Sequence, residues 1–357
     1  MLAWRDIKHP AKGGAEIVTD VYLNGLAKLG HDVTLFTSRY KDSKEQDKIN
    51  NYKVIRKGNK LTVSLHGLLY AKKHEKDYDI IIDQVNTLPF FTPLLIKKEK
   101  RVLFSHQLCK NIWPYEMMFP FSYVGYAIES IYLKFYRNTR AFTVSNSSKQ
   151  DLVKYANINP KNILVLDNQI NFQPINHPKE KENHFVFCGR LTASKRQEEA
   201  IKALSIIKDK NTKLYIIGPG NEKYKNQLKE LTNKLNLSKR VIFTGSISNQ
   251  ERNKLMQKAL AIIVTSVREG WGLIVTEANA NGTIAITYNI EGLRDANTSK
   301  TGFITKENTP EEIAKYMDLI LNNKELTIKK SKEAIKFAKA HSNWNNQVRR
   351  LEQWLRR

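Results

Sequence analysis

The sequence predicts an α/β protein made of two doubly wound domains, and three observations lead to this prediction. Short apolar runs alternate with helical patterns across residues 1–172, the alternation stops at residues 173–183, and it starts again at residue 184. The chain has 357 residues, more than a usual single domain, and 41% of them are hydrophobic, which is enough for ordinary globular cores. We therefore expect domains at 1–172 and 184–341, joined by a linker at 173–183.

The first domain is expected to begin with a very short strand at 1–4, followed by a loop and a helix. Gly13-Gly14-Ala15-Glu16 opens this helix and Gly30 ends it. This order is typical of a nucleotide-binding half domain, although G-G-A-E differs from the dinucleotide fingerprint. On spacing alone, the two glycines suit an ordinary helix entry equally well. Further strands are expected at 32–37, 52–56, 80–83, 101–105, 141–145 and 163–166.

Two polar positions border these strands. Asp77-Tyr78-Asp79 has the form of a D-x-D metal motif, but it precedes its strand and so falls at the wrong edge of the sheet for a ligand. We interpret it as a solvated turn. His106 follows the strand at 101–105, where it can face a cleft and meet a substrate hydroxyl. A histidine bonded within its own loop is the alternative.

Residues 112–137 are unusually aromatic. They hold nine aromatic side chains, and the run 117–128 has no charged residue. Twelve uncharged residues are too few to cross a bilayer, which needs roughly 18 to 20. The segment therefore suits an interfacial contact or a groove for a lipid-linked acceptor, and a large local core is the other interpretation.

The second domain repeats the alternation. Strands are expected at 184–188, 213–217, 241–244, 261–265, 283–287 and 302–305, with helices between them. From Pro310 the pattern is helical to residue 357, with breaks near Asn323 and Ser342. Residues 342–357 would form a separate final helix.

A glycine turn between strand and helix follows residues 261–265. Gly270 and Gly272 let the backbone approach a ligand, and a helix that begins at Leu273 offers its free N–H groups to an anion. Glu269 and Glu277 flank this anion site. Because a carboxylate accepts two hydrogen bonds, it suits vicinal hydroxyls. Phosphate together with two sets of diols describes a nucleotide sugar.

Two cations occupy the corresponding junction after residues 184–188. Arg190 and Lys195 lie five residues apart behind Gly189, and together they can hold a diphosphate. A surface pair in a lysine-rich chain is the alternative for each. The net charge of +24 is spread over both halves, which indicates a solvated lysine-rich surface or attraction to anionic lipid more than nucleic-acid binding. Cys109 and Cys188 are expected to be buried thiols of a reduced, cytoplasmic protein.

These motifs together resemble the retaining glycosyltransferases of group 1, or family 4. Glu269-Gly270-Trp271-Gly272-x₄-Glu277 is similar to the family's E-x₇-E signature, and Gly189-Arg190-Leu191-x₃-Lys195 to its G-R-L-x₃-K. Gly13-Gly14-Ala15-Glu16 is similar to its G-G-x-E. Further similar segments, in the family's order, are His106-Gln107, residues 145–152, Thr301-Gly302-Phe303 and Ser342-Asn343-Trp344.

The resemblance implies the GT-B fold, two Rossmann-like domains facing across a cleft, with the final helix crossing back to the first domain. Glu269 would hold hydroxyls of the donor sugar, Arg190 and Lys195 would neutralise the diphosphate, and His106 would face the transferred sugar. These four residues are the expected catalytic groups. The expected donor-binding residues are Gly13, Gly14, Gly189, Arg190, Lys195, Gly218, Gly270, Trp271, Gly272, Leu273 and Glu277, the last on the ribose diol.

Two departures from the family matter. Trp271 stands where phenylalanine is more usual, which is expected to change the bulk near the sugar. The first strand is shorter than the family's, and that edge is expected to be weakened if the native chain begins upstream of Met1.

The resemblance implies a retaining, metal-independent transferase. It would move a sugar from a UDP- or GDP-sugar to a hydroxyl of a lipid-linked surface glycan. No metal, other cofactor or nucleic acid is expected, and the enzyme would be cytoplasmic, with peripheral binding to the inner face of the plasma membrane. The alternatives are a soluble sucrose- or glycogen-type synthase, a nucleotide-sugar hydrolase, and a basic binding protein on an inactive GT-B scaffold. The sequence leaves the donor base, sugar, acceptor, linkage and oligomeric state open.

Overall fold

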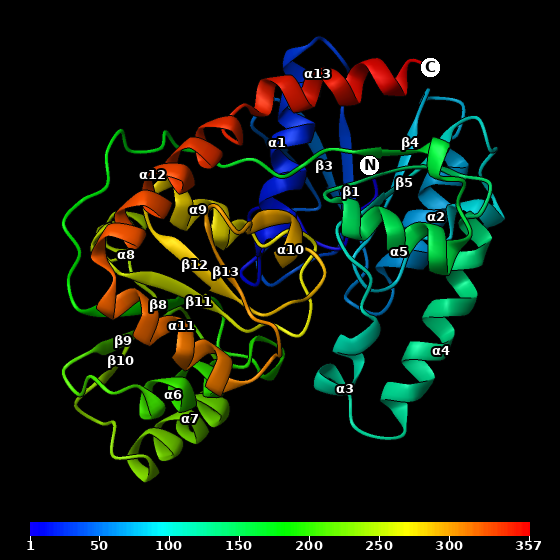
Figure 1. The fold of residues 1–357 in the computed structure, drawn as a ribbon. Coiled ribbons are helices and arrows are strands. Elements are labelled where there is room, and N and C mark those ends of the chain that lie inside the picture. Colours follow the sequence, from blue (N-terminus) through cyan, green and yellow to red (C-terminus); the bar gives the residue numbers. More distant parts are fainter. The chain divides into compact units, whose positions relative to one another are not determined.

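The chain divides into two compact α/β units. The computed structural model describes residues 1–357, with the side chains of 1–115 and 117–357. Unit 1 comprises Met1–Asn168 and Asn343–Arg357, and unit 2 comprises Gln169–Ser342 (Figure 1). Each unit has its own sheet of mainly parallel strands, so the predicted fold class is confirmed. The sequence placed the end of the first domain at residue 172, four residues after the division between the units.

Unit 2 is built on a six-stranded, wholly parallel sheet with the order β10-β9-β8-β11-β12-β13. From β8 the strands are added in one direction across the sheet up to β10, and from β11 they are added in the other direction. The loops that follow β8 and β11 therefore leave the same edge of the sheet side by side. The strands are β8 (His184–Cys188), β9 (Lys213–Ile217), β10 (Val241–Gly245), β11 (Ala261–Val264), β12 (Ile284–Thr287) and β13 (Gly302–Ile304). Strands β8, β11 and β12 are buried along their whole length, as their continuous apolar runs predict.

Helices cover this sheet and carry several of the predicted site residues. They are η5 (Ala193–Lys195, a 3₁₀ turn), α6 (Gln197–Ile206), α7 (Glu222–Lys234), α8 (Asn249–Lys258), α9 (Leu273–Ala280), α10 (Leu293–Ala296), α11 (Pro310–Asn322) and α12 (Lys324–Ala340). The breaks predicted near residues 323 and 342 are confirmed, because α11 ends at Asn322 and α12 at Ala340.

Unit 1 has two hydrogen-bonded strand groups that residues 1–3 join. Leu2 bridges to Phe36 on one side and to Asp83 on the other, both in parallel. The strands are β1 (Thr34–Thr37), β2 (Gln46–Ile49), β3 (Tyr52–Arg56), β4 (Ile81–Val85), β5 (Arg101–Ser105), β6 (Arg140–Thr143) and β7 (Ile163–Val165). Of these, β2 is an antiparallel edge strand that the sequence did not predict, because it is short and mostly polar.

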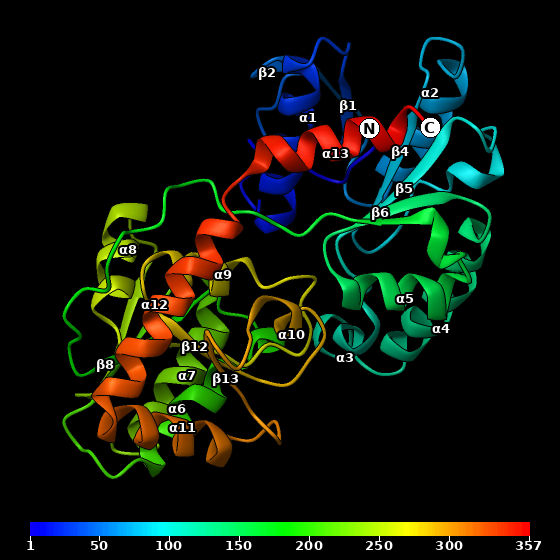
Figure 2. The ribbon, with the colours of Figure 1, turned by 45° about the horizontal axis from the view of Figure 1, so that its top comes forward.

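The helices of unit 1 come from both ends of the chain. They are α1 (Gly14–Lys28), α2 (Val63–Lys73), α3 (Trp113–Glu116), α4 (Phe121–Leu133), α5 (Asn146–Ala156) and α13 (Trp344–Leu355), with the 3₁₀ turns η1 (Thr92–Leu94), η2 (Lys110–Ile112), η3 (Lys134–Tyr136) and η4 (Pro160–Asn162). In Figures 1 and 2, α13 lies against α1. A Cβ on Gly25 would lie 2.6 Å from a methyl of Val348, so this contact needs glycine. Trp344 also meets Tyr22 edge-on, with the ring centroids 5.5 Å apart.

A buried ion pair fixes the loop that leads into α1. The Arg56 guanidinium on β3 donates to Asp6 at 2.6 Å, and the two side chains are 1% and 0% exposed. Arg56 also donates to the carbonyl of Lys44 and to Asp47. Because burial removes both charges from water, each depends on the other for stabilisation.

Arg56→Ala should therefore destabilise unit 1 by about 3–5 kcal/mol, since it leaves the Asp6 carboxylate buried without a countercharge. Urea unfolding of the purified protein measures this. Lys8→Ala is the matched control, because Lys8 also pairs with Asp47 but is 48% exposed, and it should cost under about 1 kcal/mol. Equal losses in the two variants would contradict the structural role assigned to Arg56.

Candidate active site

Hydrogen bonds hold the loops after β8 and β11 together at the point where the strand order reverses. The Thr265 hydroxyl, directly after β11, donates to the carbonyls of Lys195 at 3.0 Å and Arg196 at 2.8 Å. The Val267 amide donates to the carbonyl of Ser194 at 2.9 Å. These bonds place the turn η5 alongside the glycine-rich segment that follows residue 268.

Lys195 and Glu269 form an ion pair in this corner of unit 2. The Lys195 ammonium contacts Oε1 of Glu269, and the Ser266 hydroxyl donates to the same oxygen at 2.7 Å. The two side chains are 29% and 16% exposed, so solvent or a ligand can reach both. The sequence predicted each residue for the site, but it predicted neither their pairing nor the participation of Ser266.

The backbone of Glu269 is in close contact with Gly292. Gly292, which precedes α10, has φ +76°, and a Cβ there would lie 2.2 Å from the carbonyl oxygen of Glu269. A residue with a side chain would push the Glu269 segment away, so Gly292 supports the position of the carboxylate. The sequence showed no spacing that relates these two residues.

Arg190 follows β8 and is exposed. Within the part of the chain that the structure describes, its guanidinium has neither a hydrogen-bond partner nor a carboxylate partner. Its backbone is fixed, because the Gln197 side-chain amide donates to its carbonyl at 2.8 Å. An exposed, unpaired guanidinium on a fixed backbone is suited to an anionic ligand.

Gly189 and Gly218 bring the loops after β8 and β9 into contact. A Cβ on Gly218, whose φ is +141°, would lie 2.1 Å from the carbonyl oxygen of Gly189. Packing alone therefore accounts for Gly218. A role in donor binding remains a prediction for both glycines.

Helix α9 begins where the sequence predicted and carries Glu277. Gly272 is its N-cap with φ +93°, and Leu273 is its first residue. Glu277 pairs with Arg252 of α8 at 3.0 Å. Burial raises the pKa of Glu277, and the Arg252 charge acts in the opposite direction. The sequence did not predict that Arg252 is the partner of Glu277.

The Trp271 side chain belongs to the core of unit 2. It is 4% exposed, its indole N–H donates to Thr276 Oγ1 at 2.9 Å, and its ring lies 5.5 Å from that of His341. The indole ring is therefore a packing group, and the expectation that its bulk affects the space near the sugar stays a prediction. The backbone amides of Gly270 and Trp271 stay predicted donor contacts.

In unit 1, the glycine pair lies in the first turn of α1. Gly13 is the N-cap, and its amide donates to Oε2 of Glu16 at 2.6 Å. Glu16 is thus a capping residue, buried within the turn. Gly14 is exposed beside it.

His106 follows β5 and is buried against polar neighbours. Its Nε2 lies 2.6 Å from the side-chain nitrogen of Gln84 on β4, which also donates to Thr19 of α1 at 2.9 Å. Burial lowers the pKa of His106 to about 3, so the imidazole is neutral at physiological pH. With Nε2 accepting from Gln84, the ring proton resides on Nδ1. The main partner of His106 is therefore on a neighbouring strand and not within its own loop.

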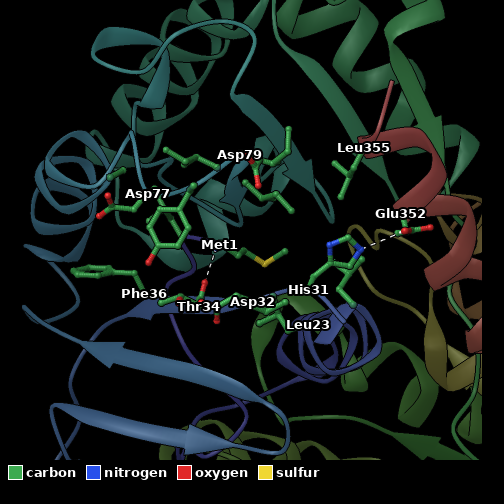
Figure 3. Close-up of a pocket in the computed structure, with 18 of the residues that line it drawn as sticks. Met1, Leu23, His31, Asp32, Thr34, Phe36, Asp77, Asp79, Glu352 and Leu355 are labelled. Atoms are coloured by element: carbon green, nitrogen blue, oxygen red, sulfur yellow. Dashed lines mark hydrogen bonds and ion pairs between the residues drawn. The ribbon is translucent and has the colours of Figure 1, made fainter. Parts of the chain in front are cut away.

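A cavity of about 680 Å³ lies at the amino ends of the strands of unit 1, whereas His106 lies at their carboxyl ends. Its lining includes Met1, Thr34 and Ile81, at or next to the amino ends of strands, together with Asp77 and Asp79 (Figure 3). The Met1 ammonium donates to the Thr34 carbonyl at 2.7 Å, and burial lowers its pKa to about 5. The cavity is therefore at the other end of the strands from the carboxyl ends, where ligands bind in parallel sheets. Asp77 pairs with His74 at 2.7 Å, as a turn residue would.

Neither a metal cluster nor a membrane span is found among the described residues. No group of three or more His, Cys, Asp or Glu side chains with described positions could hold a metal ion. No described helix has the length and apolar character needed to cross a bilayer. Cys109 and Cys188 are both buried thiols, and burial raises the pKa of Cys188 to about 12.

Comparisons with known proteins agree with this arrangement. Residues 168–341 match the family described as glycosyl transferases group 1, and residues 12–173 match glycosyltransferase family 4. An uncharacterized glycosyltransferase of Methanocaldococcus jannaschii is 26% identical over 90% of this chain and 88% of its own length. The O-antigen chain mannosyltransferase RfbU of Salmonella typhimurium is 27% identical over 58% of this chain and 59% of its own.

Solved structures show the fold of the chain. Anabaena HepE, solved in complex with UDP and glucose, superposes with a TM-score of 0.76, covering 99% of this chain and 98% of that one at 15% identity. The fold is therefore GT-B. The chain belongs to the group 1 glycosyltransferases of family 4, and it is an enzyme that transfers a sugar from a nucleotide sugar.

The buried neutral His106 predicts a pH dependence of stability. The unfolded chain protonates this histidine below its ordinary pKa of 6.5, whereas the folded chain does so only near pH 3. Stability is therefore lost as the pH falls from 6.5 towards 3. Between pH 7 and pH 5, urea unfolding should show wild type losing about 2 kcal/mol more than His106→Gln. Parallel losses in the two proteins would mean that the native ring takes up its proton at the same pKa as in the unfolded chain.

Proposed function

We propose that this protein is a retaining, metal-independent glycosyltransferase. It would move a sugar from a nucleotide-diphosphate sugar to a hydroxyl of a lipid-linked surface glycan. The observation that carries the proposal is the Lys195–Glu269 ion pair beside the exposed Arg190, where β8 and β11 leave the sheet of unit 2.

The donor would engage these groups by exchanging partners. A diphosphate attracts both cations, so Lys195 would turn from the Glu269 carboxylate to a phosphate oxygen, and Arg190 would bind beside it. Glu269, relieved of its partner, would then accept hydrogen bonds from hydroxyls of the sugar. Glu277 on α9 would accept from the ribose diol, with Arg252 holding its carboxylate.

The same groups suit the transition state of sugar transfer. Breaking the bond between the anomeric carbon and the leaving oxygen produces an oxocarbenium-like sugar and negative charge on the nucleotide diphosphate. Arg190, Lys195 and the amide-rich start of α9 would stabilise that charge. Retention of configuration follows if the acceptor hydroxyl attacks from the leaving-group face and gives its proton to a diphosphate oxygen. Neutral His106 would offer the sugar a hydrogen bond without adding charge.

Two further features support the proposed acceptor, a surface glycan carried on a lipid. RfbU, one of the relatives, acts on O-antigen chains, which supports a surface glycan as the class of acceptor here. The exposed aromatic segment of unit 1 supports an acceptor that is carried on a lipid. We accordingly propose that the enzyme works on the cytoplasmic side, as a peripheral protein of the inner face of the plasma membrane.

Glu269→Ala should reduce sugar transfer by about 100-fold or more while leaving the folded state intact, because one preorganised contact to the reacting sugar is lost. The measurement is mass spectrometry of nucleotide released from a panel of UDP- and GDP-sugars, which also reveals the donor. Glu182→Ala is the control, since Glu182 is an exposed glutamate that likewise pairs with a lysine. Near wild-type transfer by Glu269→Ala would remove Glu269 from the mechanism.

Treatment with EDTA should leave the transfer rate unchanged, because the side chains of Arg190 and Lys195 supply the positive charge that the leaving diphosphate needs. The same nucleotide-release assay, run with and without added Mg²⁺ or Mn²⁺, checks this. Complete loss with EDTA and recovery on adding either ion would contradict the metal-independent mechanism.

A further inference from the structure

Helix α4 has an apolar face turned to solvent. Phe121, Val124, Ile128 and Ile131 recur every three or four residues, which places them on one side of the helix, and they are 47% to 62% exposed. In the loop before α4, Met118 and Phe119 are 84% and 79% exposed. A helix on a water-soluble surface usually turns such a stripe towards the core. Figure 1 shows α4 extending away from the sheet of unit 1, with this loop at its far end.

The opposite side of α4 is firmly attached to unit 1. Glu129 is fully buried and accepts from the amides of Cys109 at 2.7 Å and Lys110 at 2.8 Å, and from the Trp113 indole at 3.0 Å. A Cβ on Gly125 would lie 2.6 Å from the Trp113 ring, so helix and indole are in close contact. These contacts determine which side of α4 is inside. The exposed stripe is therefore a fixed outer surface.

We propose that the hairpin formed by α3 and α4, residues 113–133, inserts its loop and outer stripe into the surface of an anionic lipid bilayer. This inference rests on the proposed function, and it assigns the membrane contact to one element. At about 1.5 Å per residue, the 13 residues of α4 measure roughly 20 Å, too short to cross a bilayer but long enough to lie in its interface.

The distribution of charge favours lipid as the occupant. Residues 117–128 contain no charged side chain, whereas Lys134 and Arg137 follow the stripe and are exposed. An apolar, aromatic tip followed by cations matches the layers of a membrane surface, with hydrocarbon beneath anionic headgroups. A second copy of this chain fits less well, because two molecules of net charge +24 repel each other.

Co-sedimentation of the full chain with vesicles tests the proposal. The anionic vesicles contain phosphatidylethanolamine with about 30% phosphatidylglycerol, and the neutral vesicles contain phosphatidylcholine alone. Wild type should bind the anionic vesicles and bind the neutral ones at least about tenfold more weakly. The triple variant Met118→Ser, Phe119→Ser, Phe121→Ser should bind anionic vesicles at least about tenfold more weakly than wild type.

A matched control comes from α2 and the loop before it in the same unit. Leu61, Leu65 and Leu69 are 87%, 60% and 55% exposed, so replacing all three by serine removes a comparable exposed apolar surface. This control should bind vesicles within about twofold of wild type. An equal loss in both triple variants would mean that general hydrophobicity drives binding, which would overturn the assignment to the hairpin. Because all six side chains are exposed, thermal unfolding followed by circular dichroism should be unchanged in both.

Two other outcomes would also overturn the proposal. One is wild-type vesicle binding by the hairpin variant. The other is a wild-type dimer, seen by sedimentation velocity without lipid, that the hairpin variant abolishes. Donor turnover is measured separately by nucleotide release without vesicles, and there the hairpin variant should equal wild type. If wild type turned over no donor yet bound vesicles through the hairpin, the proposed function would fail while this inference stood.

Discussion

The geometry of the candidate active site in unit 2 depends on one constraint, the adjacency of β8 and β11 in the sheet. Because these strands are neighbours, the Thr265 hydroxyl can bind two carbonyls of the other loop, and residues 74 positions apart in sequence then form an ion pair. The Lys195–Glu269 pair compensates the two opposite charges at this position. The pairing holds the Lys195 ammonium and the Glu269 carboxylate in position and leaves Arg190 beside them as a charge without a partner among the described residues.

Buried polar side chains perform the corresponding positioning in unit 1. Gln84 links His106 to Thr19 in the second turn of α1, so one amide contacts both the ring and this helix. Glu129 does the same for α4, where a single carboxylate binds two amides and an indole. Each of these groups would destabilise the fold if it lost its partners. Their hydrogen bonds instead fix the position of His106 and the orientation of α4.

The sequence predicts the sheets well and the side-chain partnerships poorly. Strands 101–105, 184–188 and 213–217 have the observed bounds, because continuous apolar runs with clear polar ends are local signals. Arg252 and Gly292 escaped prediction, since only the folded chain brings them to Glu277 and Glu269. Aromatic density likewise located the segment at 112–137 but could not separate buried Trp113 from exposed Phe119. The resemblance supplied the site residues, and tertiary packing decided what each one contacts.

The contribution of α13 to unit 1 has a consequence for biosynthesis. Unit 2 is continuous, whereas unit 1 needs residues 343–357 to cover Tyr22 and Gly25 of α1. At roughly 5–20 residues per second, a ribosome takes about 10–30 s to make residues 169–342. Throughout that interval the outer side of α1 lacks its covering helix. The domain that is translated first is therefore the last to be completed.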